Sequence, residues 1–116
     1  VYDICHHINV QAAREIIPKT VLAKPPSAEL RPNQKDSDSL PVYELLDPIL
    51  AAYVEKDSSF EDIIGMGFMP DVVKKIITLV DRNEYKRRQA PPGVKITPRN
   101  FGRDRRMPVA NQYQPF

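Results

Sequence analysis

The chain has 116 residues and a net charge of +2, and its 41% of hydrophobic and 28% of charged residues are typical of one soluble globular domain at most. No apolar run approaches the roughly 20 residues that cross a bilayer, and no signal peptide or lipidation motif occurs, which favours a cytoplasmic protein without a membrane partner. The single cysteine excludes an internal disulfide framework and suits a reducing compartment.

The first residues predict a helix. Val1, Ile4, Cys5 and Ile8 are spaced i, i+3, i+4 and i+7, which places them on one helical face. We expect Cys5 to be a core residue rather than a reactive thiol, because no neighbouring group would stabilise its thiolate. The chain starts within this helix and without a methionine, so we expect a fragment of a longer protein.

Residues 24–41, with the sequence KPPSAELRPNQKDSDSLP, follow a short helix predicted at residues 18–22. The prolines in this stretch lack the amide hydrogen that a helix or strand needs. The density of hydrogen-bonding side chains predicts a long loop, which is either a solvated linker or a functional lid over a site. Composition alone leaves both interpretations open.

An apolar stripe over residues 42–54 predicts the next helix. Pro48 lies inside the stripe and removes the hydrogen bond to the carbonyl of Glu44. Because the stripe runs across the proline in register, we expect a kinked but continuous helix.

Two further helices are predicted before the C-terminal tail. Ser59 and Asp62 have the spacing of a capping box for a short helix over residues 60–66. Pro70 suits the first turn of a longer helix, which we expect to run to about Arg88 before a proline-rich stop.

The tail after this helix lacks a helical period and predicts extended chain. Residues 1–81 hold 8 Lys or Arg against 13 Asp or Glu, whereas residues 82–116 hold 9 against 2. This basic C-terminal part indicates an anionic partner: nucleic acid, a phosphorylated ligand or an acidic surface of the same protein.

No catalytic constellation, metal-ligand spacing or glycine-rich phosphate loop is visible in the sequence. The basic helix end and tail, with Tyr85 for base stacking, are compatible with a nucleic-acid-binding module, although cations at a helix C-terminus also complement the helix dipole. The turn at Met66, Gly67 and Phe68 is similar to the loop of ubiquitin-associated modules, and is more simply a hydrophobic staple at a helix start.

Three longer segments carry a more specific likeness. The segments KPPSAELRPNQKDSDSLPVYELLDPIL, NEYKRRQAPPGVKITPR and FGRDRRMPVANQY resemble, in this order, the C-terminal third of the synthetase domain of bacterial glutamine-dependent NAD+ synthase. The likeness covers nearly all of residues 1–113. It implies a ligase that converts deamido-NAD to NAD: ATP adenylates the nicotinate carboxylate, and ammonia derived from glutamine displaces AMP.

The resemblance also implies roles for single residues. Ser27 matches a hydroxyl residue that binds ATP, and Tyr85 and Lys86 match positions that contact deamido-NAD. The loop matches a mobile lid, in which we assign no defined role to the charged residues Lys24, Glu29 and Arg31. A closing lid would exclude water and protect an acyl-adenylate from hydrolysis.

The family's SGGxDS pyrophosphate loop, its magnesium-binding carboxylate and its glutaminase domain have no counterpart in this sequence. We therefore expect residues 1–116 to be a mainly α-helical fragment without activity of its own. The parent would be a doubly wound α/β domain of the adenine nucleotide alpha hydrolase-like type, with a lid at 24–41, a helical segment at 42–88 and an extended basic tail at 89–116.

The implied partners follow from this assignment. They are the remainder of the synthetase domain, deamido-NAD, and ATP with Mg²⁺ as its complex in the full-length parent, with no cofactor bound by the fragment alone. Apolar helix faces left uncovered favour a homo-oligomer. The assignment implies no nucleic acid, no membrane and no metal site or catalytic residue within the fragment.

Overall fold

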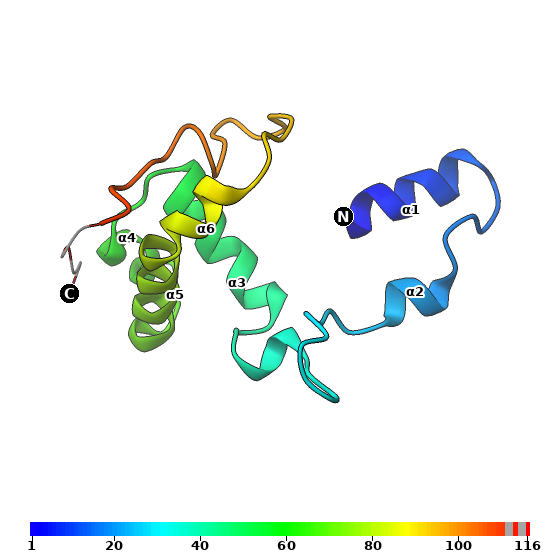
Figure 1. The fold of residues 1–116 in the computed structure, drawn as a ribbon, viewed down its shortest axis with the longest axis horizontal. Helices are drawn as coiled ribbons and strands as arrows, with labels where there is room; N and C mark the ends of the chain where they lie inside the picture. The colour runs from blue at the N-terminus through cyan, green and yellow to red at the C-terminus, as the bar shows by residue number, and fades with distance from the viewer. Residues whose placement is uncertain (111–112, 114–115) are drawn as a thin grey trace. The chain divides into compact units, whose positions relative to one another are not determined.

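The computed structural model describes residues 1–110, 113 and 116, and these residues form helices and connecting segments but no β-strand (Figure 1). Each helix in this described part of the chain is too short or too polar to span a bilayer. The chain divides into two units, Val1–Leu40 and Pro41–Phe116, which are described separately. The mainly helical character predicted for the chain is confirmed over the described residues.

The first unit contains α1 (Tyr2–Gln11), α2 (Lys19–Ala23) and the 3-10 turn η1 (Asp36–Asp38). The two predicted helices are therefore present, but no residue of Val1–Leu40 is buried. Cys5 is half-buried, so the prediction that it is a core residue is wrong for this unit. Its neighbour Ile4 on the same helical face is 58% exposed.

The second unit begins with α3 (Tyr43–Leu50), which continues without interruption into the π-helix η2 (Ala51–Glu55). Pro48 lies inside α3, and the predicted continuity across it is confirmed. The widened turn follows the proline: the amide of Lys56 donates to the carbonyl of Ala51 at 3.2 Å, a bond five residues long. A π-turn of this kind is a recognised way to absorb an irregularity within a helix.

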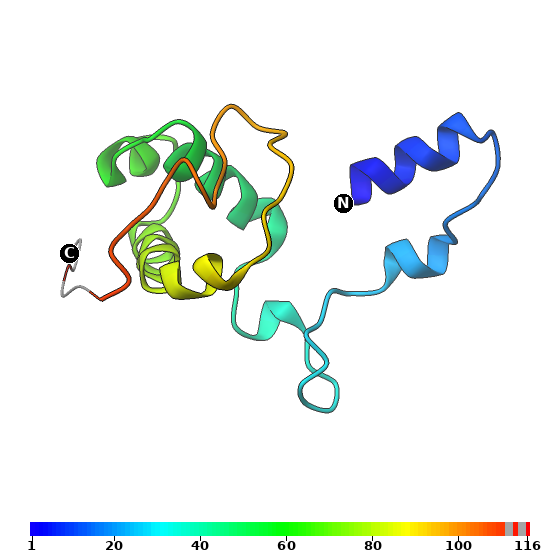
Figure 2. The ribbon, with the colours of Figure 1, turned by 45° about the horizontal axis from the view of Figure 1, so that its top comes forward.

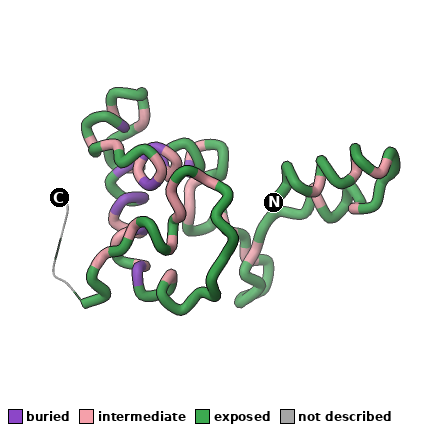
Figure 3. The backbone as a smooth tube through the Cα atoms, turned by 90° about the horizontal axis from the view of Figure 1, so that it is seen from above, coloured by how far each residue is buried: buried purple, intermediate pink, exposed green. Residues whose placement is uncertain are grey.

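The core of the second unit lies between α3, η2, α4 (Phe60–Gly65) and α5 (Pro70–Arg82), which contact one another. Figure 3 colours the buried residues of the described chain purple, and they belong to this unit. Ser59 caps α4 as predicted, because its Oγ accepts from the amide of Asp62 at 3.1 Å. The buried apolar residues are Leu46, Ile49, Ala52, Val54, Ile63, Val73, Ile76, Ile77 and Val80.

The long helix predicted from Pro70 to about Arg88 is interrupted. Helix α5 ends at Arg82, and a separate helix α6 (Glu84–Gln89) follows. Asn83 lies between them with φ −94° and ψ 17°, and its side-chain amide donates to the carbonyl of Leu79 at 2.7 Å. The asparagine side chain competes with the helical hydrogen-bond pattern, which the apolar periodicity cannot reveal.

The tail returns along the helices of the second unit (Figure 2). Its described residues form neither helix nor strand, and residues 100–104 make a compact turn in which Asn100 Oδ1 accepts from the amides of Gly102 and Arg103 at 2.7 and 3.1 Å. The prediction of extended chain at positions 111, 112, 114 and 115 lies outside the described residues.

Candidate functional site

The loop after α2 folds back on itself around an open cleft of about 290 Å³. The amide of Asp36 donates to the carbonyl of Pro26 at 3.0 Å, and the amide of Leu30 donates to Gln34 Oε1 at 3.0 Å. These bonds close the loop without a helix or strand ladder. The cleft is lined by Lys24, Pro25, Ser27, Glu29, Arg31, Asn33, Gln34 and Lys35.

Four residues predicted from the sequence meet at this cleft: Lys24, Ser27, Glu29 and Arg31. Ser27 is half-buried, and its Oγ accepts from the amide of Glu29 at 3.0 Å. Glu29 has a φ of 52°, in the left-handed region of the backbone conformations. The structure therefore brings these side chains together as a single group.

Lys24 and Glu29 form an ion pair, with 2.8 Å between Nζ and Oε1, while both side chains are 69% exposed. The hydrogen bond and the charge of Glu29 raise the pKa of Lys24, and those of Lys24 lower the pKa of Glu29. Both groups are charged at neutral pH. An exposed pair of this kind contributes little to stability, so the lysine is available to an anionic ligand at small cost.

Tyr85 and Lys86 belong to the second unit and lie on α6. Both side chains are exposed, Tyr85 by 45%, and the Nζ of Lys86 is 5.9 Å from the centre of the Tyr85 ring. An ammonium group next to an aromatic face can bind a phosphate while the ring stacks on a base or a pyridine. The residues predicted to bind substrate thus form two groups. The cleft residues belong to the first unit, and Tyr85 and Lys86 belong to the second.

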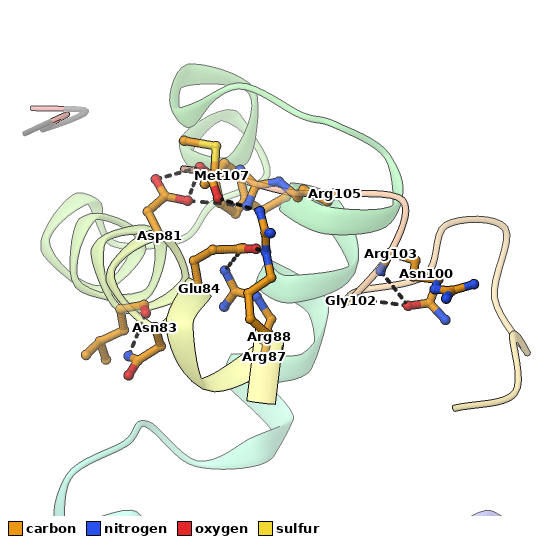
Figure 4. Close-up of polar contacts among 12 residues, drawn as sticks. Asp81, Asn83, Glu84, Arg87, Arg88, Asn100, Gly102, Arg103, Arg105 and Met107 are labelled. Carbon is orange, nitrogen blue, oxygen red and sulfur yellow. Dashed lines mark hydrogen bonds and ion pairs between the residues drawn. The ribbon is translucent and has the colours of Figure 1, made fainter. Parts of the chain in front are cut away.

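The opposite face of α6 carries a network that the sequence reasoning missed (Figure 4). Glu84 is 2% exposed and pairs with Arg87 and Arg88 over 2.8 and 2.7 Å. Burial by itself raises the pKa of Glu84, but the hydrogen bonds from Arg88 and Arg87 and from the main chain of Met107 bring its pKa below the ordinary value. The i, i+3 and i, i+4 spacing of these charges was a visible signal.

A second network joins the tail to η2 and α5. Arg105 Nη1 lies 3.3 Å from Asp81 Oδ1, and its guanidinium carbon lies 4.0 Å from the centre of the Tyr53 ring. The hydroxyl of Tyr53 donates to Asp81 at 3.1 Å. Burial is the main cause of the raised pKa of Tyr53, so its hydroxyl stays protonated and holds this contact.

Much of the basic charge of the C-terminal part is therefore paired within the second unit. Arg99 also pairs with Asp57, with 2.6 Å between Nη1 and Oδ2, and Lys95 pairs with Asp104 over 2.7 Å. Of the partners that the charge asymmetry indicated, these ion pairs favour an acidic surface of the same protein.

Comparison with known proteins identifies the family. The sequence profile of the family described as NAD synthase matches residues 1–90. The chain belongs to the NAD synthase family. This membership favours the hypothesis drawn from the three sequence segments over the nucleic-acid-binding and ubiquitin-associated alternatives.

Curated relatives of this family resemble nearly the whole chain. A glutamine-dependent NAD(+) synthetase of Acinetobacter baylyi is 52% identical over 115 residues, which are 99% of this chain and 21% of that protein. One from Aquifex aeolicus is 58% identical over 97 residues, 84% of this chain and 17% of that protein. The chain thus spans about a fifth of the length of the curated relatives it matches.

A solved structure of the family is also similar. The glutamine-dependent NAD+ synthetase of Acinetobacter baumannii, solved in complex with adenosine diphosphate, is 42% identical. The match has a TM-score of 0.58 and covers 93% of this chain and 18% of that one. The relationship therefore extends from sequence to fold.

Proposed function

We propose that this chain is the C-terminal part of the synthetase domain of a glutamine-dependent NAD+ synthase. The single observation that carries the proposal is family membership over residues 1–90 together with about 50% identity to named relatives along almost the entire chain. In this proposal the full protein is a cytoplasmic ligase and a homo-oligomer. The helices of this chain complete a doubly wound α/β domain whose strands belong to the remainder of the protein.

The proposed reaction joins ammonia to the nicotinate carboxyl of deamido-NAD. A carboxylate oxygen attacks the α-phosphate of ATP and releases pyrophosphate; ammonia then attacks the acyl carbon, AMP leaves with the electron pair of the acyl–oxygen bond, and the nitrogen loses its excess proton. Mg²⁺ would enter with ATP and stabilise charge on its phosphates. We propose that the magnesium ligands of this reaction belong to the remainder of the protein.

The residues around the cleft suit the ATP side of this reaction. Ser27 presents a hydroxyl, and the cations Lys24, Arg31 and Lys35 line the same cleft. Hydroxyl and cationic donors form charge-assisted hydrogen bonds with phosphate oxygens. We assign the ATP contact to Ser27 and propose that residues 24–41 act as a lid that excludes water from the acyl-adenylate.

The exposed face of α6 suits the dinucleotide side. Lys86 would pair with the pyrophosphate of deamido-NAD, and Tyr85 would supply a stacking surface. Neither side chain is fixed by a buried contact, so both can reach a ligand. The basic tail would brace this helix through Phe101 and Met107.

The proposal is tested in the full-length synthase with Ser27→Ala and Lys86→Ala. We expect Ser27→Ala to raise the KM for ATP and Lys86→Ala to raise the KM for deamido-NAD, each about 10-fold or more, because a charge-assisted contact is lost. Steady-state amidation of deamido-NAD is the readout. Thr20→Ala and Lys56→Ala, at exposed positions outside the proposed lid and α6, are the matched controls.

Undiminished amidation by both Ser27→Ala and Lys86→Ala would overturn the residue assignments.

The chain by itself provides a separate test. Purified residues 1–116 should not turn over ATP or deamido-NAD, and measurable turnover would contradict the proposal that the remainder of the domain is indispensable.

A further inference from the structure

Helix α6 is held in place by a buried charged residue. It has only the six residues Glu84–Gln89, and a helix of this length does not persist without tertiary contacts. Its one buried residue is Glu84, a carboxylate rather than an apolar side chain. The position of α6 therefore depends on the polar partners of this residue, since a buried charge is tolerated only when it is paired and hydrogen-bonded.

Those partners come from α6 itself and from the tail. Arg87 Nη2 and Arg88 Nε donate to the two carboxylate oxygens of Glu84 at 2.8 and 2.7 Å. Arg88 Nη2 also donates to the carbonyl of Met107 at 3.1 Å. Arg88 thus joins the carboxylate of Glu84 to the main-chain carbonyl of one tail residue (Figure 4).

A further contact involves Arg87. Its guanidinium carbon lies 4.9 Å from the centre of the Phe101 ring, and the Arg87 side chain is 14% exposed. The tail therefore meets α6 at two points on the face that carries Glu84. We refer to Glu84, Arg87, Arg88 and the main chain of Met107 as the α6 clamp.

The clamp and the proposed substrate contacts occupy different faces of the helix. Successive helical residues are rotated by about 100°, so Tyr85 and Lys86 point away from the side that Glu84 and Arg88 share. Their exposure agrees with this: Glu84 is 2% exposed and Tyr85 is 45% exposed. A rotation of α6 about its axis would move both substrate contacts together.

We propose that Glu84 is a positioning residue for deamido-NAD: through the α6 clamp it fixes the rotation of α6 and so holds Tyr85 and Lys86 toward the dinucleotide. This inference rests on the proposed function of Tyr85 and Lys86 and assigns no contact between Glu84 and substrate. It also assigns a role to the tail, because Met107 supplies the part of the clamp that lies outside α6.

The test uses Glu84→Gln in the full-length synthase, with dissociation constants for deamido-NAD and ATP measured separately by calorimetry. The amide keeps the shape of the side chain but loses the charge that holds both arginines. We expect deamido-NAD to bind about 10- to 100-fold more weakly, because a small misplacement of the binding groups weakens their contacts. The affinity for ATP should not change. The matched control is Asp104→Asn, which makes the same chemical change at the exposed pair with Lys95.

A second variant distinguishes a loss of positioning from a general loss of folding. Arg88→Lys keeps the positive charge but removes the guanidinium that bonds both Glu84 Oε1 and the carbonyl of Met107. It should weaken deamido-NAD binding in the same selective way, with a thermal midpoint close to that of the parent. Equal losses of affinity for both ligands, or no loss in either variant, would overturn the positioning role.

A double-mutant cycle separates this inference from the proposed function. If Glu84 acts through Lys86, then Glu84→Gln should weaken deamido-NAD binding much less in a Lys86→Ala background than in the parent. An additive result overturns the inference while leaving the proposed site intact. If Lys86→Ala and Tyr85→Ala do not affect binding, the site assignment fails, and the inference fails with it.

Discussion

The two units of the chain differ in how their apolar residues are covered. Among the described residues of Pro41–Phe116, nine apolar side chains are buried between packed helices. In Val1–Leu40 no residue is buried, and the apolar face of α1 includes Ile4 at 58% and Ile8 at 39% exposure. Regular helices with the right apolar spacing therefore form in both units, but only the second has the packing that makes a helix resist unfolding.

The two units should differ most in how much stability is lost when an apolar side chain is truncated. Ile76→Ala removes a side chain that is 1% exposed, and we expect it to lower the free energy of unfolding by about 2–5 kcal/mol. Ile4→Ala, the matched change on α1, should lower it by no more than about 0.5 kcal/mol. Urea denaturation of the chain measures both. Equal losses would show that the apolar face of α1 is buried as well.

The next effect concerns the tail. Arg105→Ala leaves Asp81, whose side chain is 8% exposed, without its cation, and should cost about 1–3 kcal/mol. Arg106→Ala, at an exposed neighbouring position, is the control and should change stability by less than about 0.5 kcal/mol. A negligible effect of Arg105→Ala in urea denaturation would show that the second unit does not depend on its tail.

A smaller effect is expected with pH. Glu84 has a lowered pKa when folded, so its ionised form favours the folded state. Its contribution is complete above the pKa of an unfolded glutamate, about 4.3, and is lost as the pH falls through the folded pKa. The difference in free energy of unfolding between the parent chain and Glu84→Gln should therefore shrink as the pH falls below about 4.3. A constant difference from neutral pH down to about 3 would contradict the assignment.

The smallest effect is expected at the start of α4. Ser59→Ala removes the capping hydroxyl and should cost about 1 kcal/mol. Ser58→Ala is the neighbouring control, since the side chain that accepts from the amide of Asp62 belongs to Ser59. If both variants lose the same stability in thermal unfolding, the capping box does not determine where α4 begins.

The local elements were predictable because their signals are short-range. The apolar spacing over residues 42–54 and the Ser59 and Asp62 pair predicted helices that the structure contains. The break at Asn83 was missed because the apolar period continues across it, while the asparagine side chain bonds a carbonyl of the preceding turn. Cys5 was misjudged because a helical face shows which residues can be buried and not whether anything covers them.

At the candidate site, too, the sequence predicted some residues and missed others. The sequence singled out Ser27, Tyr85 and Lys86 through family resemblance, and their roles stay predictions. The spacing of Glu84, Arg87 and Arg88 indicated possible pairing, but not that Glu84 is buried, because a charged residue gives no sign of burial until its partners are known. Pairing across 24 residues, as between Asp81 and Arg105, depends on a fold that brings the tail back to α5.

The sequence by itself determined the family, the helical elements and the basic character of the C-terminal part, since each follows from residue order and local spacing. The tertiary structure decided which of those helices acquire a core and what the basic residues do. In Pro41–Phe116, arginines of α6 pair with the buried carboxylate of Glu84, and Arg105 of the tail pairs with the largely covered carboxylate of Asp81. That outcome depends on desolvation and on partners distant in sequence, and neither is encoded in a local pattern.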